Sequence, residues 1–137
     1  MEAGATALTL ADTTGMATPR RIDEVLGAVG PRVGLHLHDT RGTALLNAHT
    51  AYRAGVRDFD TAVGGLGGSP FAQGATGNLA TEDLVYLMED LGVETGVDLS
   101  RLLQASRLVS ELIGRPVPSR VAAAGPRLSP ASSPNPG

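Results

Sequence analysis

Three strand–loop–helix units follow one another along this chain, and their repetition constrains the fold more than any other feature. Short runs rich in aliphatic and β-branched residues at 5–10, 32–38 and 58–63 predict strands. Each run is followed by a loop and then by apolar residues at helical spacing, which predict helices beginning near 19, 44 and 81. Because a helix lies between successive strands, the strands are expected to be parallel.

Polar and glycine-rich residues lie in the loop after each predicted strand. This is the arrangement of a (β/α)8 or TIM barrel, in which the chemistry collects at the carboxyl ends of the strands. A whole barrel takes about 250 residues, so three units supply part of one. A doubly wound open sheet is the alternative, but its phosphate-binding G-x-G-x-x-G motif does not follow the first strand. We therefore expect an α/β fold that forms a partial TIM barrel.

The first helix has clear signals at both ends. Thr18 and Pro19 supply a capping residue and a proline at the first helical position, and Gly30-Pro31 stops the helix, which predicts a helix over 19–29. The apolar residues of this segment recur at helical spacing and predict one buried stripe, made of Ile22, Val25, Leu26 and Val29.

Two more helices and a proline-rich end follow the glycine-rich loop. The helix of the third unit begins with Glu82 and Asp83 in its first turn, where acidic side chains interact favourably with the helix dipole. Asp98 predicts the cap of a fourth helix that extends to about 113. Prolines and small residues dominate after 114, and we expect the last ten or so residues to be disordered. The chain thus divides into a barrel part, 1–128, and a disordered tail, 129–137.

The second predicted strand carries two histidines, His36 and His38, in the motif HLHDTRG at 36–42. Side chains alternate along a strand, so the leucines face one way and both imidazoles the other. A polar pair near the carboxyl end of a barrel strand suits a ligand or metal site. A pair of hydrogen-bonded core histidines fits the same spacing, so the spacing alone leaves both interpretations open.

Composition excludes several classes of function. The chain has 137 residues, is 42% hydrophobic and carries a net charge of -3. Its few basic residues are scattered, so we expect no nucleic-acid partner. No apolar run reaches the roughly 18 residues of a membrane span, so we expect no membrane partner and a cytoplasmic location. Cysteine is absent, which excludes a disulfide framework and a thiolate nucleophile.

Three motifs resemble successive signatures of one enzyme family. They are DTTG at 12–15, HLHDTRG at 36–42 and GLGGSPFAQGATGNLATED at 65–83. Together they resemble hydroxymethylglutaryl-CoA (HMG-CoA) lyase. The first two are shared by the wider superfamily of metal-dependent Claisen enzymes on TIM barrels, and the third is the more diagnostic. The resemblance covers roughly 3–128, and it corresponds to the last three βα units of the barrel plus a carboxyl-terminal helical extension.

The resemblance implies a metal site. In the family, both histidines of the H-x-H strand and the asparagine of the GNLATED segment bind a divalent cation, which assigns these roles to His36, His38 and Asn78. Imidazole and oxygen ligands with open positions suit Mg2+ or Mn2+. The activity implied is cleavage of 3-hydroxy-3-methylglutaryl-CoA, or a related acyl-CoA substrate, to acetyl-CoA and acetoacetate by retro-Claisen chemistry.

The resemblance also assigns catalytic and substrate-binding residues. An aspartate in a DTTG loop more often caps a turn, but the family match favours proton transfer for Asp12. Ser69 stands where the family usually has a cysteine that handles a proton, and an alcohol exchanges protons near neutrality far less readily than a thiol. Substrate contacts are implied for Thr13, Gly67 and Gly68, with the glycines letting the loop fold close over the substrate.

Asp39 has two interpretations from its position after the histidine strand. It could orient one of the histidines as a hydrogen-bond acceptor, or it could cap the turn that follows.

The matched stretch leaves out the Arg-Asp pair of the family's first strand and the glutamate of its second. We therefore expect this chain to act with a complementing amino-terminal half-barrel chain or as a homodimer. Two alternatives to the lyase remain. One is an acyl-CoA condensing synthase of the same superfamily. The other is a non-catalytic remnant that self-associates through unpaired strand edges.

Overall fold

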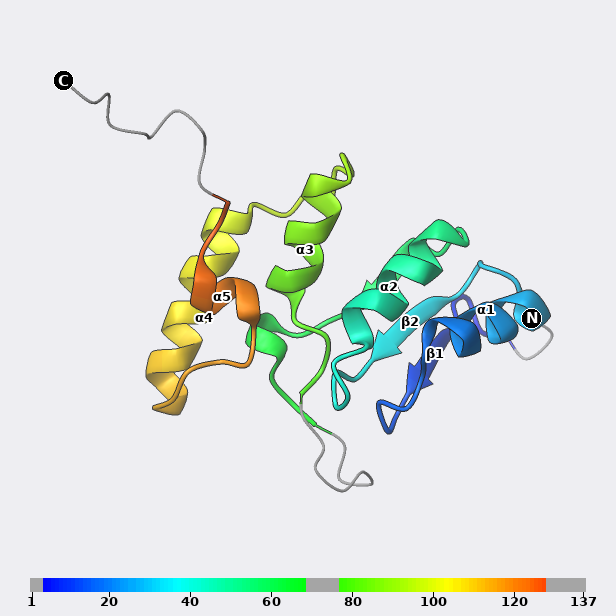
Figure 1. Ribbon diagram of the computed structural model, residues 1–137, viewed down its shortest axis with the longest axis horizontal. Coiled ribbons are helices and arrows are strands. Elements are labelled where there is room, and N and C mark those ends of the chain that lie inside the picture. Colours follow the sequence, from blue (N-terminus) through cyan, green and yellow to red (C-terminus); the bar gives the residue numbers. More distant parts are fainter. Residues whose placement is uncertain (1–3, 69–76, 128–137) are drawn as a thin grey trace.

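The computed structural model describes residues 4–68 and 77–127. Three parallel strands, β1 (Thr9–Asp12), β2 (Gly34–Leu37) and β3 (Asp58–Asp60), form one sheet in the order β1-β2-β3 (Figure 1). The predicted α/β class and parallel pairing are confirmed. The first strand exists, but its predicted bounds, 5–10, were wrong, because β1 begins only at Thr9, opposite Gly34 where β2 begins, and extends to Asp12. The third strand is also shorter than predicted, and a 3-10 turn, η1 (Val63–Gly65), follows it.

Five helices accompany the sheet: α1 (Pro19–Val29), α2 (Ala44–Arg53), α3 (Thr81–Asp90), α4 (Leu99–Ile113) and α5 (Arg120–Ala124). The bounds of α1 match the prediction. Asp98 caps α4 as predicted, since its side chain accepts a hydrogen bond from the Arg101 amide at 3.0 Å. No helix within residues 4–68 and 77–127 combines the length and the apolar character that a membrane span requires.

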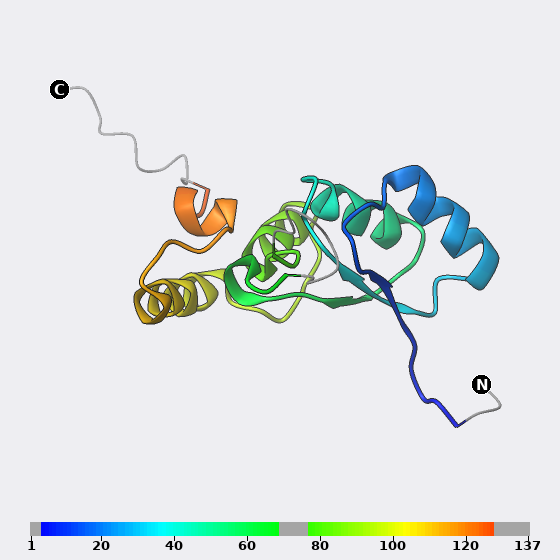
Figure 2. The same ribbon diagram turned by 90° about the horizontal axis from the view of Figure 1, so that it is seen from below.

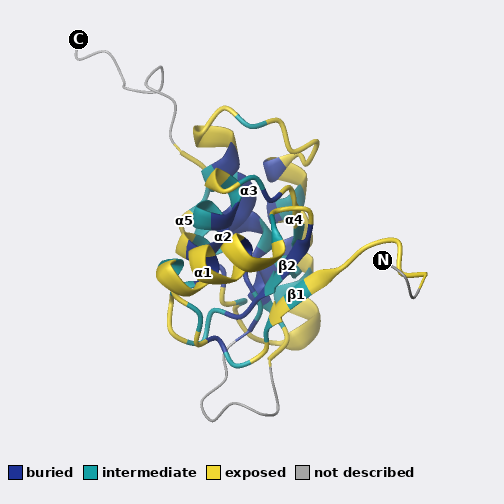
Figure 3. Cartoon of the chain, turned by 90° about the vertical axis from the view of Figure 1, so that its right-hand side faces the viewer, coloured by how far each residue is buried: buried dark blue, intermediate teal, exposed yellow. Residues whose placement is uncertain are grey.

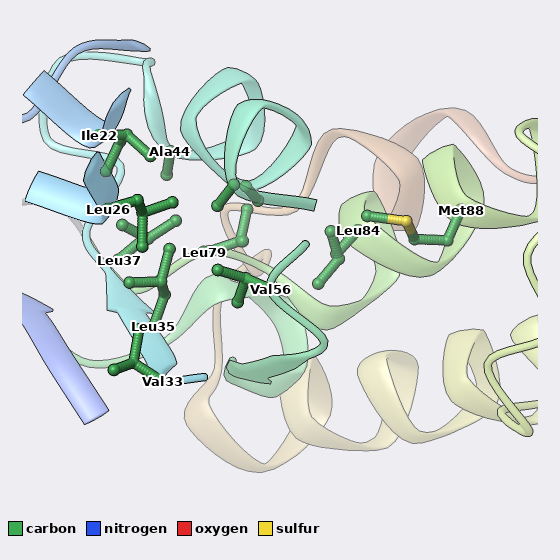
Figure 4. Packing of buried hydrophobic residues seen from close by; sticks show 12 residues of the cluster. Ile22, Leu26, Val33, Leu35, Leu37, Ala44, Val56, Leu79, Leu84 and Met88 are labelled. Atoms are coloured by element: carbon green, nitrogen blue, oxygen red, sulfur yellow. The ribbon is translucent and has the colours of Figure 1, made fainter. Parts of the chain in front are cut away.

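Helices α1 and α2 lie on the same side of the three strands (Figure 2). Leu35 and Leu37 of β2 are buried there, together with Ile22 and Leu26 of α1 and the alanine face of α2 (Figure 4). Burying one leucine contributes about 2 kcal/mol, so the two leucines determine which face of β2 packs against the helices. His36 and His38 therefore project from the other face.

The buried stripe of α1 is narrower than predicted. Val25 and Val29 are exposed, because α1 packs against α2 and the buried leucines of β2 only through the side that carries Ile22 and Leu26. Figure 3 shows the exposed outer side of α1 and the exposed stretch before β1.

The carboxyl-terminal helix α5 was not predicted, because it lies in a segment rich in proline and small residues. Its N-cap is Ser119, whose side chain accepts a hydrogen bond from the Ala122 amide. The carboxylate of Asp83 on α3 accepts hydrogen bonds from Ser119 Oγ at 2.7 Å and from the Val121 amide at 2.9 Å. A side chain distant in sequence therefore stabilises this short helix. The predicted tail, 129–137, lies outside the described residues.

Candidate functional site

The two histidines of β2 form a pair on one face of the sheet. Their ring centroids are 4.9 Å apart, and the rings meet edge to face at 75°. His38 is buried, with 6% of its surface exposed, whereas His36 is partly exposed. The sequence prediction that both imidazoles share one face is confirmed.

Each imidazole is oriented through its Nδ1 atom. His36 Nδ1 lies 2.8 Å from Asp60 Oδ2, and His38 Nδ1 lies 3.0 Å from the carbonyl oxygen of Asp12. A carbonyl and an ionised carboxylate can only accept, so both rings donate from Nδ1, and in a neutral ring this leaves the lone pair on Nε2. This is the tautomer in which a histidine binds a metal through Nε2 while its other nitrogen donates to an acceptor.

Asn78 lies beside the histidine pair. Its backbone forms an isolated antiparallel bridge with His38, and residues directly opposite in such a bridge have side chains on the same face. The Asn78 side chain donates from Nδ2 to the carbonyl of Leu66 at 3.0 Å. Its Oδ1 atom is buried and has no hydrogen-bond partner among the residues that the structure describes. A buried acceptor without a partner is unfavourable, so this oxygen suits a bound cation or another donor.

The donors available here fit a divalent cation. Two imidazole Nε2 atoms and one amide oxygen would provide nitrogen and oxygen ligands and would leave further coordination positions for water or substrate. Within the described ranges, no three His, Cys, Asp or Glu side chains cluster in a way that could hold a metal. A three-ligand set at this place therefore needs the amide of Asn78.

Glycines pack closely around Asn78. Gly67 has φ +92°, and a Cβ atom added there would lie 2.8 Å from Asn78 Nδ2. Gly65 has φ +71°, and an added Cβ would lie 3.1 Å from the Asn78 carbonyl oxygen. The glycines at 65 and 67 thus allow the chain to approach Asn78, a role that the sequence analysis did not foresee. Gly68 is exposed and ends the described part of this loop.

The buried carboxylate of Glu82 is hydrogen-bonded to the start of the same loop. Both oxygens of Glu82 accept from the Gly64 amide, at 2.8 and 2.9 Å, and Ser106 on α4 donates to Oε1. Glu82 is 0% exposed. The sequence analysis placed Glu82 in the first turn of α3 and assigned it a helix-dipole role. Its partners, Gly64 and Ser106, are distant in sequence, so no local signal could reveal the contact.

Asp12 supports the loop that follows β1. Its Oδ1 and Oδ2 atoms accept from the amides of Met16 and Ala17 at 3.0 and 3.1 Å. Its strand partner is Leu37, and it lines a hollow of about 210 Å³ on the side of the sheet that α1 covers. The carboxylate therefore lies on the face opposite the imidazoles, and the carbonyl of the same residue contacts His38. The catalytic role of Asp12 stays a prediction.

The other residues singled out by the sequence analysis form no hydrogen bond with the two imidazoles in the described part of the chain. Ser69 lies outside the described residues, and Thr13 is exposed. Asp39 caps the start of α2, since its Oδ1 accepts from the Ala44 amide at 2.9 Å, and its Oδ2 lies 3.4 Å from Arg120 Nη1. Of the two interpretations of Asp39, the structure supports the cap. Asp60, which the sequence analysis did not single out, is the acid that contacts a histidine.

Comparison with known proteins identifies the family. The family model described as HMGL-like matches residues 1–109. The chain is 49% identical over 131 residues to (R)-citramalyl-CoA lyase from Chloroflexus aurantiacus. This match covers 92% of this chain and 41% of that protein. It is 47% identical over 126 residues to human mitochondrial HMG-CoA lyase, covering 88% of this chain and 39% of that protein.

Solved structures give the same result. The structure of an HMG-CoA lyase from Acinetobacter baumannii in complex with coenzyme A and 3-methylmalate is 46% identical, with a TM-score of 0.85. The match covers 98% of this chain and 45% of that chain. The expected partial TIM barrel is confirmed, and the chain spans about two fifths of the length of its curated relatives. The chain belongs to the HMGL-like family, which includes the HMG-CoA lyases.

Proposed function

We propose that this chain carries the metal-binding part of a carbon–carbon lyase that cleaves HMG-CoA or a related 3-hydroxyacyl-CoA. The observation that carries the proposal is the arrangement of His36, His38 and Asn78. Two neighbouring imidazoles have their Nδ1 atoms hydrogen-bonded, and the residue opposite His38 has a buried amide oxygen without a partner in the described part of the chain. These three side chains would hold Mg2+ or Mn2+.

The three proposed ligands would hold the cation, and the cation would activate the substrate. His36 and His38 would bind the cation through Nε2 and Asn78 through Oδ1, while their other polar atoms hydrogen-bond to Asp60, the Asp12 carbonyl and the Leu66 carbonyl. A divalent cation held there would polarise the substrate oxygens and stabilise the negative charge that develops on them. A base removes the proton of the 3-hydroxyl group, the carbon–carbon bond breaks, and the enolate of acetyl-CoA then takes up a proton.

Asp12 and Ser69 are the proposed proton-handling groups. The Asp12 carboxylate holds the Met16 and Ala17 amides on the face opposite the imidazoles, so its side chain must turn toward the imidazole face before Asp12 can take a proton from a substrate bound there. Ser69 would relay a proton through its hydroxyl group. We propose Thr13, Gly67 and Gly68 as substrate contacts.

The names of two relatives support the proposed substrate class. One is named a citramalyl-CoA lyase and another an HMG-CoA lyase, and both substrates are 3-hydroxyacyl-CoA thioesters. We propose that the acyl part is a branched 3-hydroxy acid carrying a second carboxylate. Acetoacetate is the expected product from HMG-CoA, whereas citramalyl-CoA would yield pyruvate.

We also propose that a further polypeptide segment completes the barrel. In the sheet described here, β1 and β3 are each paired on one side only. A strand edge with unpaired backbone groups favours the addition of another strand. The complementing segment would be an amino-terminal half-barrel chain or a second copy of this chain. A cytoplasmic location stays a prediction.

The test combines metal binding with product analysis. The chain is titrated with Mn2+ and is then assayed with HMG-CoA, alone and with an amino-terminal half-barrel chain of a relative. One Mn2+ site and release of acetoacetate support the lyase. Net formation of a hydroxyacyl-CoA from acetyl-CoA and a keto acid would instead indicate the synthase. An aggregate in size-exclusion chromatography without Mn2+ affinity would indicate a non-catalytic remnant.

A further inference from the structure

We propose that Asp60 is a positioning residue for His36 and fixes the tautomer in which Nε2 carries the lone pair. This inference rests on the proposed role of the histidine pair in binding a cation. Asp60 lies outside the three sequence motifs, and it would act on the cation only through His36. Asp60 lies at the end of β3, four residues before the glycine-rich loop begins at Gly64.

The sheet register brings the two side chains together. His36 of β2 pairs with Asp60 of β3, and paired residues of neighbouring parallel strands project from the same face. The Asp60 Oδ2 atom lies 2.8 Å from His36 Nδ1, which is a normal hydrogen-bond distance. The carboxylate accepts, so the proton of a neutral His36 ring is held on Nδ1.

The neighbouring acid of the same strand has no such contact. Asp58 projects from the same face as Asp60 because side chains alternate along a strand, but it pairs with Gly34, which has no side chain to hold. Asp58 and Asp60 thus carry the same charge on one strand and one face, and only Asp60 touches an imidazole. Asp58 therefore provides a matched control.

The two histidines are held by different kinds of acceptor. His38 donates to the carbonyl of Asp12, which belongs to the backbone and survives any side-chain substitution. His36 depends on a side chain. Asp60 is therefore the residue through which the orientation of one imidazole can be changed while the other stays fixed.

A purely structural role for Asp60 predicts a different result from a positioning role. The Asp60 side chain is 66% exposed, and ion pairs in such exposed positions contribute little to stability. Loss of an acceptor that orients a metal-binding histidine, by contrast, weakens metal affinity by about 10 to 100-fold. Substitution of Asp60 should therefore change the tautomer and the metal affinity and leave the unfolding transition almost unchanged.

The experiment compares the full 137-residue chain with its Asp60→Ala and Asp58→Ala variants. NMR at about pH 8, where an ordinary imidazole is neutral, reports the tautomer of His36 from its ring nitrogen shifts without any metal. Mn2+ titration gives the affinity, and urea unfolding gives the stability. We expect the Nδ1–H tautomer for His36 in the unsubstituted chain and in Asp58→Ala. In Asp60→Ala we expect a shift toward Nε2–H, with Mn2+ affinity reduced about 10 to 100-fold.

The outcomes separate this inference from the proposed function. A His36 ring that is already Nε2–H in the unsubstituted chain, or that keeps its tautomer in Asp60→Ala, overturns the inference. Equal loss of Mn2+ affinity in both variants also overturns it, because charge alone would then explain the effect. If the unsubstituted chain binds no Mn2+, the proposed metal site fails, and the NMR comparison still decides whether Asp60 sets the tautomer.

Discussion

Asn78 lies directly opposite His38 in an antiparallel bridge, although the two residues belong to different segments of the chain. Two hydrogen bonds flank this contact, from the Leu79 amide to the Leu37 carbonyl at 2.9 Å and from the Asp39 amide to the Gly77 carbonyl at 3.1 Å. The end of the glycine-rich loop is thus attached to the end of the histidine strand. This attachment brings the amide of Asn78 to the imidazole face.

Replacement of Gly67 by alanine should disturb Asn78 specifically. Gly67 has φ +92°, and its new Cβ would lie 2.8 Å from Asn78 Nδ2. Gly96→Ala is the matched control, since Gly96 has φ +73° but no atom within 4 Å of an added Cβ. Both variants should lose about 1 kcal/mol in the free energy of unfolding from backbone strain. Only Gly67→Ala should weaken Mn2+ binding. Equal Mn2+ affinities of the two variants in a titration would contradict a role for the close approach of Gly67 to the Asn78 side chain.

Glu82→Gln should destabilise the chain, because both carboxylate oxygens accept from the Gly64 amide and a glutamine would replace one of them with an NH2 donor that faces another donor. The Gly64 amide and the Ser106 hydroxyl both donate to Glu82. Loss of hydrogen bonds to a buried charge costs about 2 kcal/mol. The exposed Glu94→Gln substitution should change stability by less than about 0.5 kcal/mol. Urea unfolding measures both, and similar values for the two variants would contradict the anchoring role of Glu82.

Ser119→Ala should loosen α5 and leave α4 unchanged. Ser119 accepts from the Ala122 amide and donates to Asp83, so its loss removes the cap and one contact with α3, while the hydrogen bond from the Val121 amide to Asp83 remains. Loss of a cap costs about 1 kcal/mol. Hydrogen exchange at Ala122 should accelerate, while exchange in Leu99–Ile113 stays the same. Unchanged exchange at Ala122 would show that α5 does not depend on this contact.

Ser69→Cys should raise the turnover of the complemented enzyme, because a thiol exchanges protons near neutrality more readily than an alcohol. We expect an increase in kcat of about tenfold or more, in line with the usual effect of a well-placed acid or base. Ser69→Ala is the control and should not raise kcat. Acetoacetate release from HMG-CoA measures both variants, and an unchanged kcat in Ser69→Cys would exclude a proton-relay role for this position.

Local sequence signals predicted the elements that depend on local interactions. The bounds of α1 and the cap of α4 follow from Pro19, Gly30 and Asp98, each of which acts within a few residues. The common face of His36 and His38 follows from strand alternation, which is also a local rule. The family resemblance added Asn78, which no spacing argument connects with the histidines.

Elements that depend on distant partners could not be predicted in this way. Helix α5 needs Asp83, and the turn at Gly64 needs Glu82. The contact of Asp60 with His36 exists only because β3 pairs with β2 in one register. Sequence reasoning identified the acidic residues near these places but assigned Glu82 and Asp83 to the helix dipole, because their partners lie far along the chain.

The central claim is that His36, His38 and Asn78 bind one divalent cation. Electron paramagnetic resonance of Mn2+ titrated into the chain and into its His36→Ala and Asn78→Ala variants tests it most directly. We predict one bound Mn2+ per unsubstituted chain and a large loss of binding in each variant. Absence of binding to the unsubstituted chain, or binding that survives both substitutions unchanged, would contradict the claim.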